Sequence, residues 1–161
     1  MKDLIQEELK RVARPDLKKL ALADFLQHLI LQSLYRLGVF KNLVFTGELD
    51  DDDLKAAYGG AYAFVSASLL EGFGLPGLEA MRFGLPLAVS NISVFNEIYG
   101  NGAIYFDPEK PESIAQCLNL LAQDRLYYMQ VKKKALEWSK IFSWEKCAKE
   151  TLEIYNNFLT S

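Results

Sequence analysis

SASLLEGFGLPGLEAMRFG, residues 66–84, is the stretch of this sequence that decides its fold. An apolar run at residues 61–67, AYAFVSA, leads into it and predicts a buried strand. Gly72 and Gly74 then indicate a loop, and Pro76 stands where the first turn of a helix is expected. A strand that passes through a glycine-containing loop into a helix is typical of a parallel sheet covered by helices.

The same alternation of short apolar runs and helical patterns continues along the chain. Further strands are predicted at LVFTG, GLPLAVS and AIYFDP, residues 43–47, 84–90 and 103–108. Further helices are expected after the acidic run 50–53 and at residues 93–100, 111–122, 124–140 and 143–159. We therefore predict an α/β fold for residues 41–161, a Rossmann-like parallel sheet flanked by helices on both faces.

Residues 1–40 carry a different pattern, without the short apolar runs of strands. Apolar side chains recur at helical spacing from Leu4 onward, with an interruption at Pro15. Gly38 follows the last periodic residue, a position where glycine commonly ends a helix. We expect a helical N-terminal segment that packs on the lobe formed by residues 41–161, within a single domain overall.

The composition is that of an ordinary globular domain. Half of the 161 residues are hydrophobic, 24% are charged, and the net charge is −3. Nucleic-acid binding would need a clustered basic surface. The basic run Lys132 to Lys134 lies within a helical pattern, so we interpret it as a solvated helix face. Nucleic acid is therefore not expected among the partners.

The N-terminus and the cysteines favour a cytoplasmic protein. The first residues lack the apolar core of a signal peptide, and the longest apolar stretch, residues 20–37, carries too many polar side chains to span a bilayer. Cys117 and Cys147 show neither metal-ligand spacing nor a disulfide framework. We expect no transmembrane segment and no metal site.

The loop at residues 71–75 has the chemistry of an anion-binding site. It follows a predicted strand, and parallel sheets bind ligands at the carboxyl ends of their strands. Glycines let a ligand approach the backbone, and the helix that follows presents unpaired N–H groups that suit a phosphate. Glu71 and Glu79 add carboxylates that accept hydrogen bonds from sugar hydroxyls. As an isolated pair, however, such glutamates are more often a solvated loop acid and an acid that stabilises the helix dipole.

The wider motif resembles glycosyltransferase family 4, also called group 1, a large family of retaining enzymes with the two-domain GT-B fold. The family pattern S-x-x-E-G-F-G-L-P-x-L-E-A-M is matched from Ser68 to Met81. The segments FTGELDDDDLKAAY, GLPLAVSN, AIYFDPEKPESIA and FSWEKCAKETLEIY are also similar to the family, so the likeness covers residues 42–159. The resemblance implies the C-terminal, nucleotide-sugar-binding lobe of a GT-B enzyme.

The resemblance also implies a role for each residue of the motif. Glu71 would be the catalytic residue and contact hydroxyls of the transferred sugar, and Glu79 would hold the ribose hydroxyls of the nucleotide. The backbone that lines the sugar and the diphosphate would be that of Gly72, Phe73, Gly74 and Leu75. The substrate would be a UDP- or GDP-linked sugar, bound without a metal or other cofactor. A hexose would pass with retention to a glycan or a lipid-linked acceptor, in polysaccharide biosynthesis.

Two departures from the family pattern leave the activity open. In the family, an arginine and a lysine after the first strand clamp the diphosphate, whereas Arg11, Arg14, Lys18 and Lys19 fall on helical spacing here. No acceptor-binding domain is found among the 161 residues, so we expect one on a partner domain or a second chain. Peripheral membrane association of the complete enzyme stays open. The alternative is a non-catalytic nucleotide-sugar-binding or interaction domain, or the remnant of a truncated enzyme.

The acidic run Asp50 to Asp53 allows two interpretations. It could be the metal-binding D-x-D of the other glycosyltransferase fold. Acids before and inside a first helical turn more often cap the helix and stabilise its dipole, so we favour capping.

Overall fold

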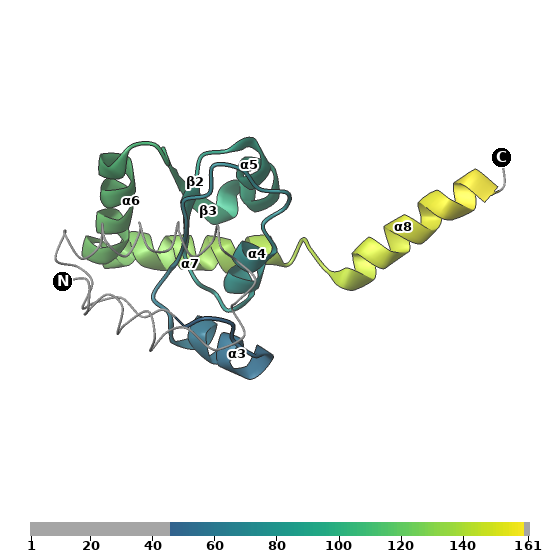
Figure 1. The fold of residues 1–161 in the computed structure, drawn as a ribbon, viewed down its shortest axis with the longest axis horizontal. Helices are drawn as coiled ribbons and strands as arrows, with labels where there is room; N and C mark the ends of the chain where they lie inside the picture. Colours follow the sequence, from purple (N-terminus) through teal and green to yellow (C-terminus); the bar gives the residue numbers. More distant parts are fainter. Residues whose placement is uncertain (1–45, 160–161) are drawn as a thin grey trace, which may run out of the picture. The chain divides into compact units, whose positions relative to one another are not determined.

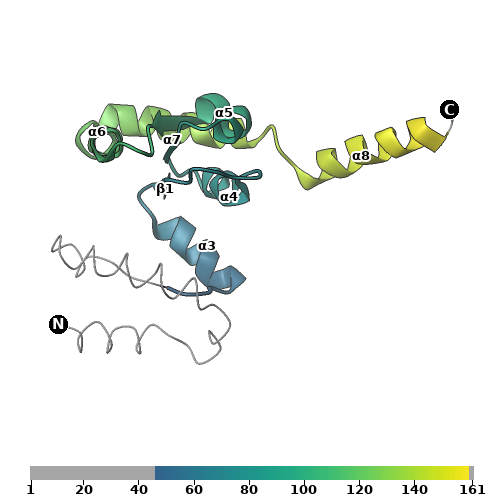
Figure 2. The same ribbon diagram turned by 45° about the horizontal axis from the view of Figure 1, so that its top comes forward.

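The computed structural model describes residues 46–159, which contain a three-stranded parallel sheet with helices packed on both of its faces (Figures 1 and 2). Three strands pair in the order β1-β2-β3: β1 (Phe64–Ser66), β2 (Leu87–Ser90) and β3 (Ala103–Phe106). The helices are α3 (Asp51–Gly60), α4 (Leu75–Arg82), α5 (Ser93–Tyr99), α6 (Pro111–Gln123), α7 (Arg125–Ser139) and α8 (Trp144–Leu159), with a 3-10 turn at Gly100–Gly102. The predicted α/β class and parallel sheet are confirmed.

Several predictions fall at the N-terminal end of the chain. The helical segment expected at residues 1–40 lies outside the described residues, as do the first three residues of the strand expected at 43–47. The described end of that predicted strand is wrong, because Thr46 and Gly47 form no strand. Gly47 has a φ of 66°, which lies in the left-handed region and takes the backbone out of an extended course.

Contacts divide the chain into two units, Met1–Leu54 and Lys55–Ser161. The described part of the first unit contains the start of α3, where a carboxylate oxygen of Asp50 accepts hydrogen bonds from the backbone N–H groups of Asp52 and Asp53 at 3.1 and 2.8 Å. This is the geometry of a helix cap, so the capping interpretation of the acidic run is confirmed. The second unit contains the sheet.

Each face of the sheet buries its own apolar cluster, because alternate residues of β2 point to opposite sides. Leu87 and Val89 belong to the first cluster, with residues of α4 and α5, while Ala88 belongs to the second, with Cys117 and Leu121 of α6. All four residues of β2 are buried, as expected for the central strand of a parallel sheet covered on both faces. The predicted helices on both faces are therefore present.

Helix α7 contributes to both clusters. Val131 lies in the cluster shared with α6, and Ala135, one turn later, lies in the cluster shared with α4 and α5. Trp138 packs on the same side as Ala135, and its indole N–H donates to the Ile98 carbonyl at 2.9 Å. Both views show α7 passing α6 and reaching α4 (Figures 1 and 2). Helix α7 thus packs against both apolar clusters, one on each face of the sheet.

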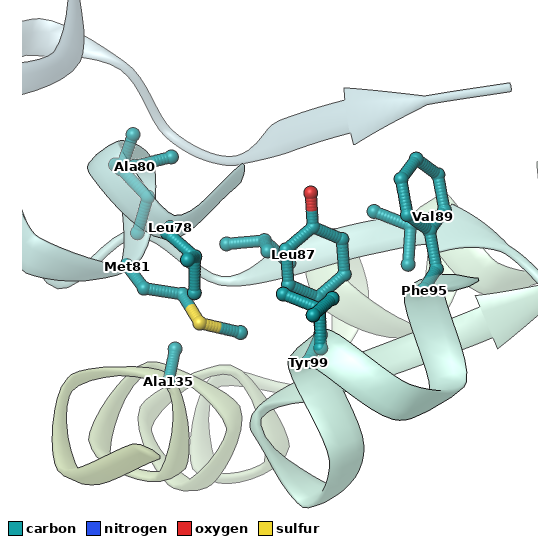
Figure 3. Packing of buried hydrophobic residues seen from close by; sticks show 10 residues of the cluster. Leu78, Ala80, Met81, Leu87, Val89, Phe95, Tyr99 and Ala135 are labelled. Atoms are coloured by element: carbon teal, nitrogen blue, oxygen red, sulfur yellow. The ribbon is translucent and has the colours of Figure 1, made fainter. Parts of the chain in front are cut away.

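The Tyr99 side chain fills the space between α5 and the start of α4. It is fully buried among Met81, Leu87 and Phe95 (Figure 3), and its hydroxyl donates to the Gly74 carbonyl at 2.6 Å. A Cβ added at Gly77 would lie 2.3 Å from the Tyr99 hydroxyl oxygen. The packing of Tyr99 against α4 therefore requires a glycine at position 77.

No helix within residues 46–159 is long and apolar enough to cross a membrane. Both free cysteines lie on helices, Cys117 buried on α6 and Cys147 exposed on α8.

Replacement of Gly77 by alanine should destabilise the domain. A glycine-to-alanine change in an exposed helix interior usually stabilises a protein by roughly 1 kcal/mol. At Gly77 the new Cβ would collide with the Tyr99 ring, so we expect a loss of about 1–3 kcal/mol in the free energy of unfolding, measured by urea denaturation.

The matched control for this change is Gly59→Ala in α3, where an added Cβ meets no atom within 4 Å. We expect that variant to unfold at the wild-type urea concentration or slightly above it. A Gly77→Ala protein as stable as Gly59→Ala would show that the Tyr99 packing is not a constraint.

Candidate functional site

The loop between β1 and α4 lies at the carboxyl edge of the sheet. Strand β1 ends at Ser66, and the hydroxyl of Ser90, the last residue of β2, donates to the Ser66 carbonyl at 3.3 Å. The parallel pairing of β1 and β2 brings both strand ends to this edge. The predicted site residues from Glu71 to Leu75 follow directly, at the edge where α/β folds bind ligands.

Gly74 sets the angle at which the chain enters α4. Its φ of 95° is in the left-handed region, which favours glycine. Its carbonyl accepts hydrogen bonds from the Gly77 N–H at 3.1 Å and from the Tyr99 hydroxyl at 2.6 Å. No side chain caps this end of α4, and no acidic residue lies in its first turn. The positive end of the helix dipole therefore meets no side-chain acceptor of its own.

Glu71 is half-buried in the loop, and a serine orients its carboxylate. The Ser68 hydroxyl donates to Oε1 of Glu71 at 2.9 Å, and it also lies 3.2 Å from the Ser66 hydroxyl. Among the described residues, Oε2 of Glu71 has no hydrogen-bond partner. Burial and the negative charge of Glu71 raise the pKa of the Tyr99 hydroxyl, so Tyr99 remains a donor below the loop.

Glu79 is exposed on α4, and a tyrosine of α3 contacts it. The Tyr58 hydroxyl lies 3.2 Å from Oε2 of Glu79 and 3.3 Å from the Pro76 carbonyl oxygen, so the two acceptors share its hydrogen. Burial, followed by the charge of Glu79 and the hydrogen bond to it, raises the pKa of Tyr58 to about 12. Tyr58 therefore stays protonated, and a donor, throughout the physiological pH range.

The remaining predicted residues line an open surface. Phe73 and Leu75 are 44% and 45% exposed, so neither side chain is held in the core. An added Cβ at Gly72 would meet no atom within 4 Å, so the packing of the chain leaves space beside this backbone. Hollows along α6 and between β3 and α7 lie away from the loop and contain none of the predicted residues. Phe73, Leu75 and the backbone of Gly72 are thus open on this side of the loop.

The structure brings together residues that the sequence motif did not indicate. Tyr58 and Tyr99 reach the motif from α3 and α5, and neither spacing nor composition distinguishes them from ordinary core tyrosines. Ser68 belongs to the motif, but its contact with Glu71 could not be read from the pattern. Within residues 46–159 no cluster of three or more His, Cys, Asp or Glu side chains is arranged to hold a metal ion.

Comparison with known proteins adds evidence that is independent of this geometry. Residues 25–138 match the profile of the family described as glycosyl transferases group 1. The serotype-specific mannosyltransferase WbdA of Escherichia coli is 40% identical over 119 residues, which are 74% of this chain and 15% of that protein. The O-antigen chain mannosyltransferase B of Escherichia coli is 35% identical over 111 residues, 69% of this chain and 29% of that protein. The chain therefore spans less than a third of either relative.

The fold has a close match among solved structures. The sucrose-phosphate synthase of Thermosynechococcus elongatus superposes with a TM-score of 0.74 at 22% identity, over 81% of this chain and 34% of that protein. At that identity the match supports the fold alone, and it agrees with the parallel sheet and the flanking helices described above. On the matched family profile and this fold, the chain belongs to the glycosyl transferases group 1, as a C-terminal domain of the GT-B type.

Proposed function

We propose that this chain is the donor-binding domain of a retaining hexosyltransferase that uses a UDP- or GDP-linked sugar. Glu79 would accept hydrogen bonds from the ribose hydroxyls, and Glu71 would contact the transferred sugar as the catalytic residue. The backbone from Gly72 to Leu75 would line the sugar and the diphosphate. In this proposal the donor is a substrate, and neither a metal nor another cofactor takes part.

The observation that carries the proposal is the arrangement of the two glutamates around the start of α4. Each carboxylate has one oxygen hydrogen-bonded to a hydroxyl of the chain, Ser68 for Glu71 and Tyr58 for Glu79. The other oxygen of each has no partner among the described residues, so it can accept hydroxyl donors from a ligand. Glu71 precedes α4 and Glu79 lies within it, which suits a ligand with a sugar at each end.

The start of α4 suits the diphosphate that joins those two sugars. A helix N-terminus carries a partial positive charge, and at this one no side chain caps the helix, although Pro76 has no N–H and the Gly77 N–H already donates to the Gly74 carbonyl. As the bond to the transferred sugar breaks, negative charge grows on the leaving diphosphate, and donors aimed at that charge lower the barrier. The open space beside Gly72 lets the phosphate approach the backbone.

The relatives indicate which donors to test first. Two of them are named as mannosyltransferases, and one name refers to the O-antigen chain. We infer that the hexose is mannose and that the complete enzyme works in polysaccharide biosynthesis. Transfer also needs an acceptor site, which we assign to a partner domain or a second chain because the relatives are several times longer than this chain.

Replacement of Glu79 by alanine should weaken binding of the nucleotide itself. Hydrogen bonds to a charged carboxylate each contribute roughly 1.5–3 kcal/mol, so we expect the Kd for UDP or GDP to rise about 10- to 100-fold. Isothermal titration of the 161-residue chain with UDP, GDP, UDP-mannose and GDP-mannose measures this change.

The matched control is Glu112→Ala, since Glu112 is also exposed and also lies near the start of a helix, α6. Its nucleotide affinity should equal that of the wild type. If the wild type binds none of the four ligands, the proposed function is wrong. If Glu79→Ala binds as the wild type does, the ribose role is wrong.

Replacement of Glu71 by glutamine should weaken binding of the nucleotide sugar and leave binding of the free nucleotide almost unchanged. The variant keeps the size of the side chain but loses the charge that accepts sugar hydroxyls, so the Kd for the nucleotide sugar should rise about 10-fold or more. The Kd for the free nucleoside diphosphate should change by less than about twofold. Equal losses for both ligands would show that Glu71 does not contact the sugar.

A further inference from the structure

Tyr58 lies along one face of α4 and contacts a residue near its start, one in its middle and the one that follows its end. Its ring packs against Phe83 with centroids 5.5 Å apart, and its hydroxyl reaches the Pro76 carbonyl and the Glu79 carboxylate. These positions are separated by three and four residues, the spacing that places side chains on the same face of a helix. Tyr58 is therefore held at its ring and aims its hydroxyl at Glu79.

We propose that Tyr58 is a positioning residue for the nucleotide, which holds the Glu79 carboxylate in the orientation that receives the ribose. The proposal rests on the proposed function, because it assumes that Glu79 binds the ribose hydroxyls. Tyr58 occupies one side of Oε2 and leaves Oε1 open, so the carboxylate is oriented before a ligand arrives.

Tyr58 lowers the entropy cost of ordering the exposed Glu79 side chain when a ligand binds. Glu79 is exposed on α4, and among the described residues its carboxylate hydrogen-bonds only to Tyr58. Without that bond the carboxylate would sample several rotamers, and a ligand would have to select one of them on binding. The Tyr58 hydroxyl also contacts the Pro76 carbonyl, so it fixes the position of the Glu79 carboxylate relative to the first turn of α4. The diphosphate is proposed to lie at that turn.

The decisive variant is Tyr58→Phe, which keeps the ring against Phe83 and removes only the hydroxyl. We expect the Kd for UDP or GDP, whichever the wild type binds, to rise about three- to tenfold, the factor expected when a ligand must immobilise a free side chain. The Kd for the matching 2′,3′-dideoxynucleoside diphosphate should stay within about twofold of the wild-type value, because that ligand has no ribose hydroxyls for Glu79 to receive.

Two further variants separate positioning from a general loss of structure. In the Glu79→Ala background, adding Tyr58→Phe should cause no further loss of affinity, since the carboxylate that it orients is gone. Tyr62→Phe is the matched control: its hydroxyl donates to the Leu121 carbonyl at 2.7 Å, and it precedes β1, at the opposite end of the strand from the motif. That variant should bind the nucleotide as the wild type does.

The outcomes distinguish the inference from the function on which it rests. If the wild type binds neither UDP nor GDP, or Glu79→Ala leaves the affinity unchanged, the proposed nucleotide site fails and the inference fails with it. If Glu79→Ala weakens binding and Tyr58→Phe does not, the inference alone is overturned. An equal loss for the dideoxy ligand, or an additional loss in the Glu79→Ala background, would also overturn it, because Tyr58 would then support the fold in general.

Discussion

The hydrogen bond from the Tyr99 hydroxyl to the Gly74 carbonyl connects the core of this domain to the loop of its candidate site. Tyr99 is fully buried against the central strand, and Gly74 is the residue at which the loop turns into α4. Because the core fixes the tyrosine ring, it also fixes where α4 begins. The direction of α4 therefore depends on this contact. So do the positions of Glu71, which precedes the first turn of α4, and of Glu79, which follows it.

The same region shows how a rigid core supports an open surface. On the core side of the loop, Tyr99 leaves no room for a side chain at Gly74 or Gly77. On the other side, Gly72, Phe73 and Leu75 are exposed to solvent. Within this open surface the two carboxylates are still oriented, each by one hydroxyl. The loop thus combines oriented acceptors with a helix end that no side chain caps.

Much of the fold could be predicted from the sequence, since the motif marks a strand, a turn and a helix in turn. The apolar runs at 61–67, 84–90 and 103–108 each contain a strand of the sheet, although every strand is shorter than its run. Strand ends depend on where pairing stops, which periodicity does not encode. The contacts of Tyr58 and Tyr99 with the motif were not predictable, because each joins residues that lie far apart in the sequence. The ligand roles of Glu71 and Glu79 stay predictions, which rest on the family resemblance and on this geometry.

The position of α7 in both apolar clusters has a consequence for folding during synthesis. The sheet and α4 to α6 leave the ribosome first, yet each face of the sheet lacks a covering contact until Val131, Ala135 and Trp138 have emerged. A nascent chain that ends before Arg125 would expose apolar surface on both faces of β2 at once. The packing of the sheet is therefore completed only by a helix that follows β3 and α6 in the chain, so an element made late decides when the strands made before it become stable.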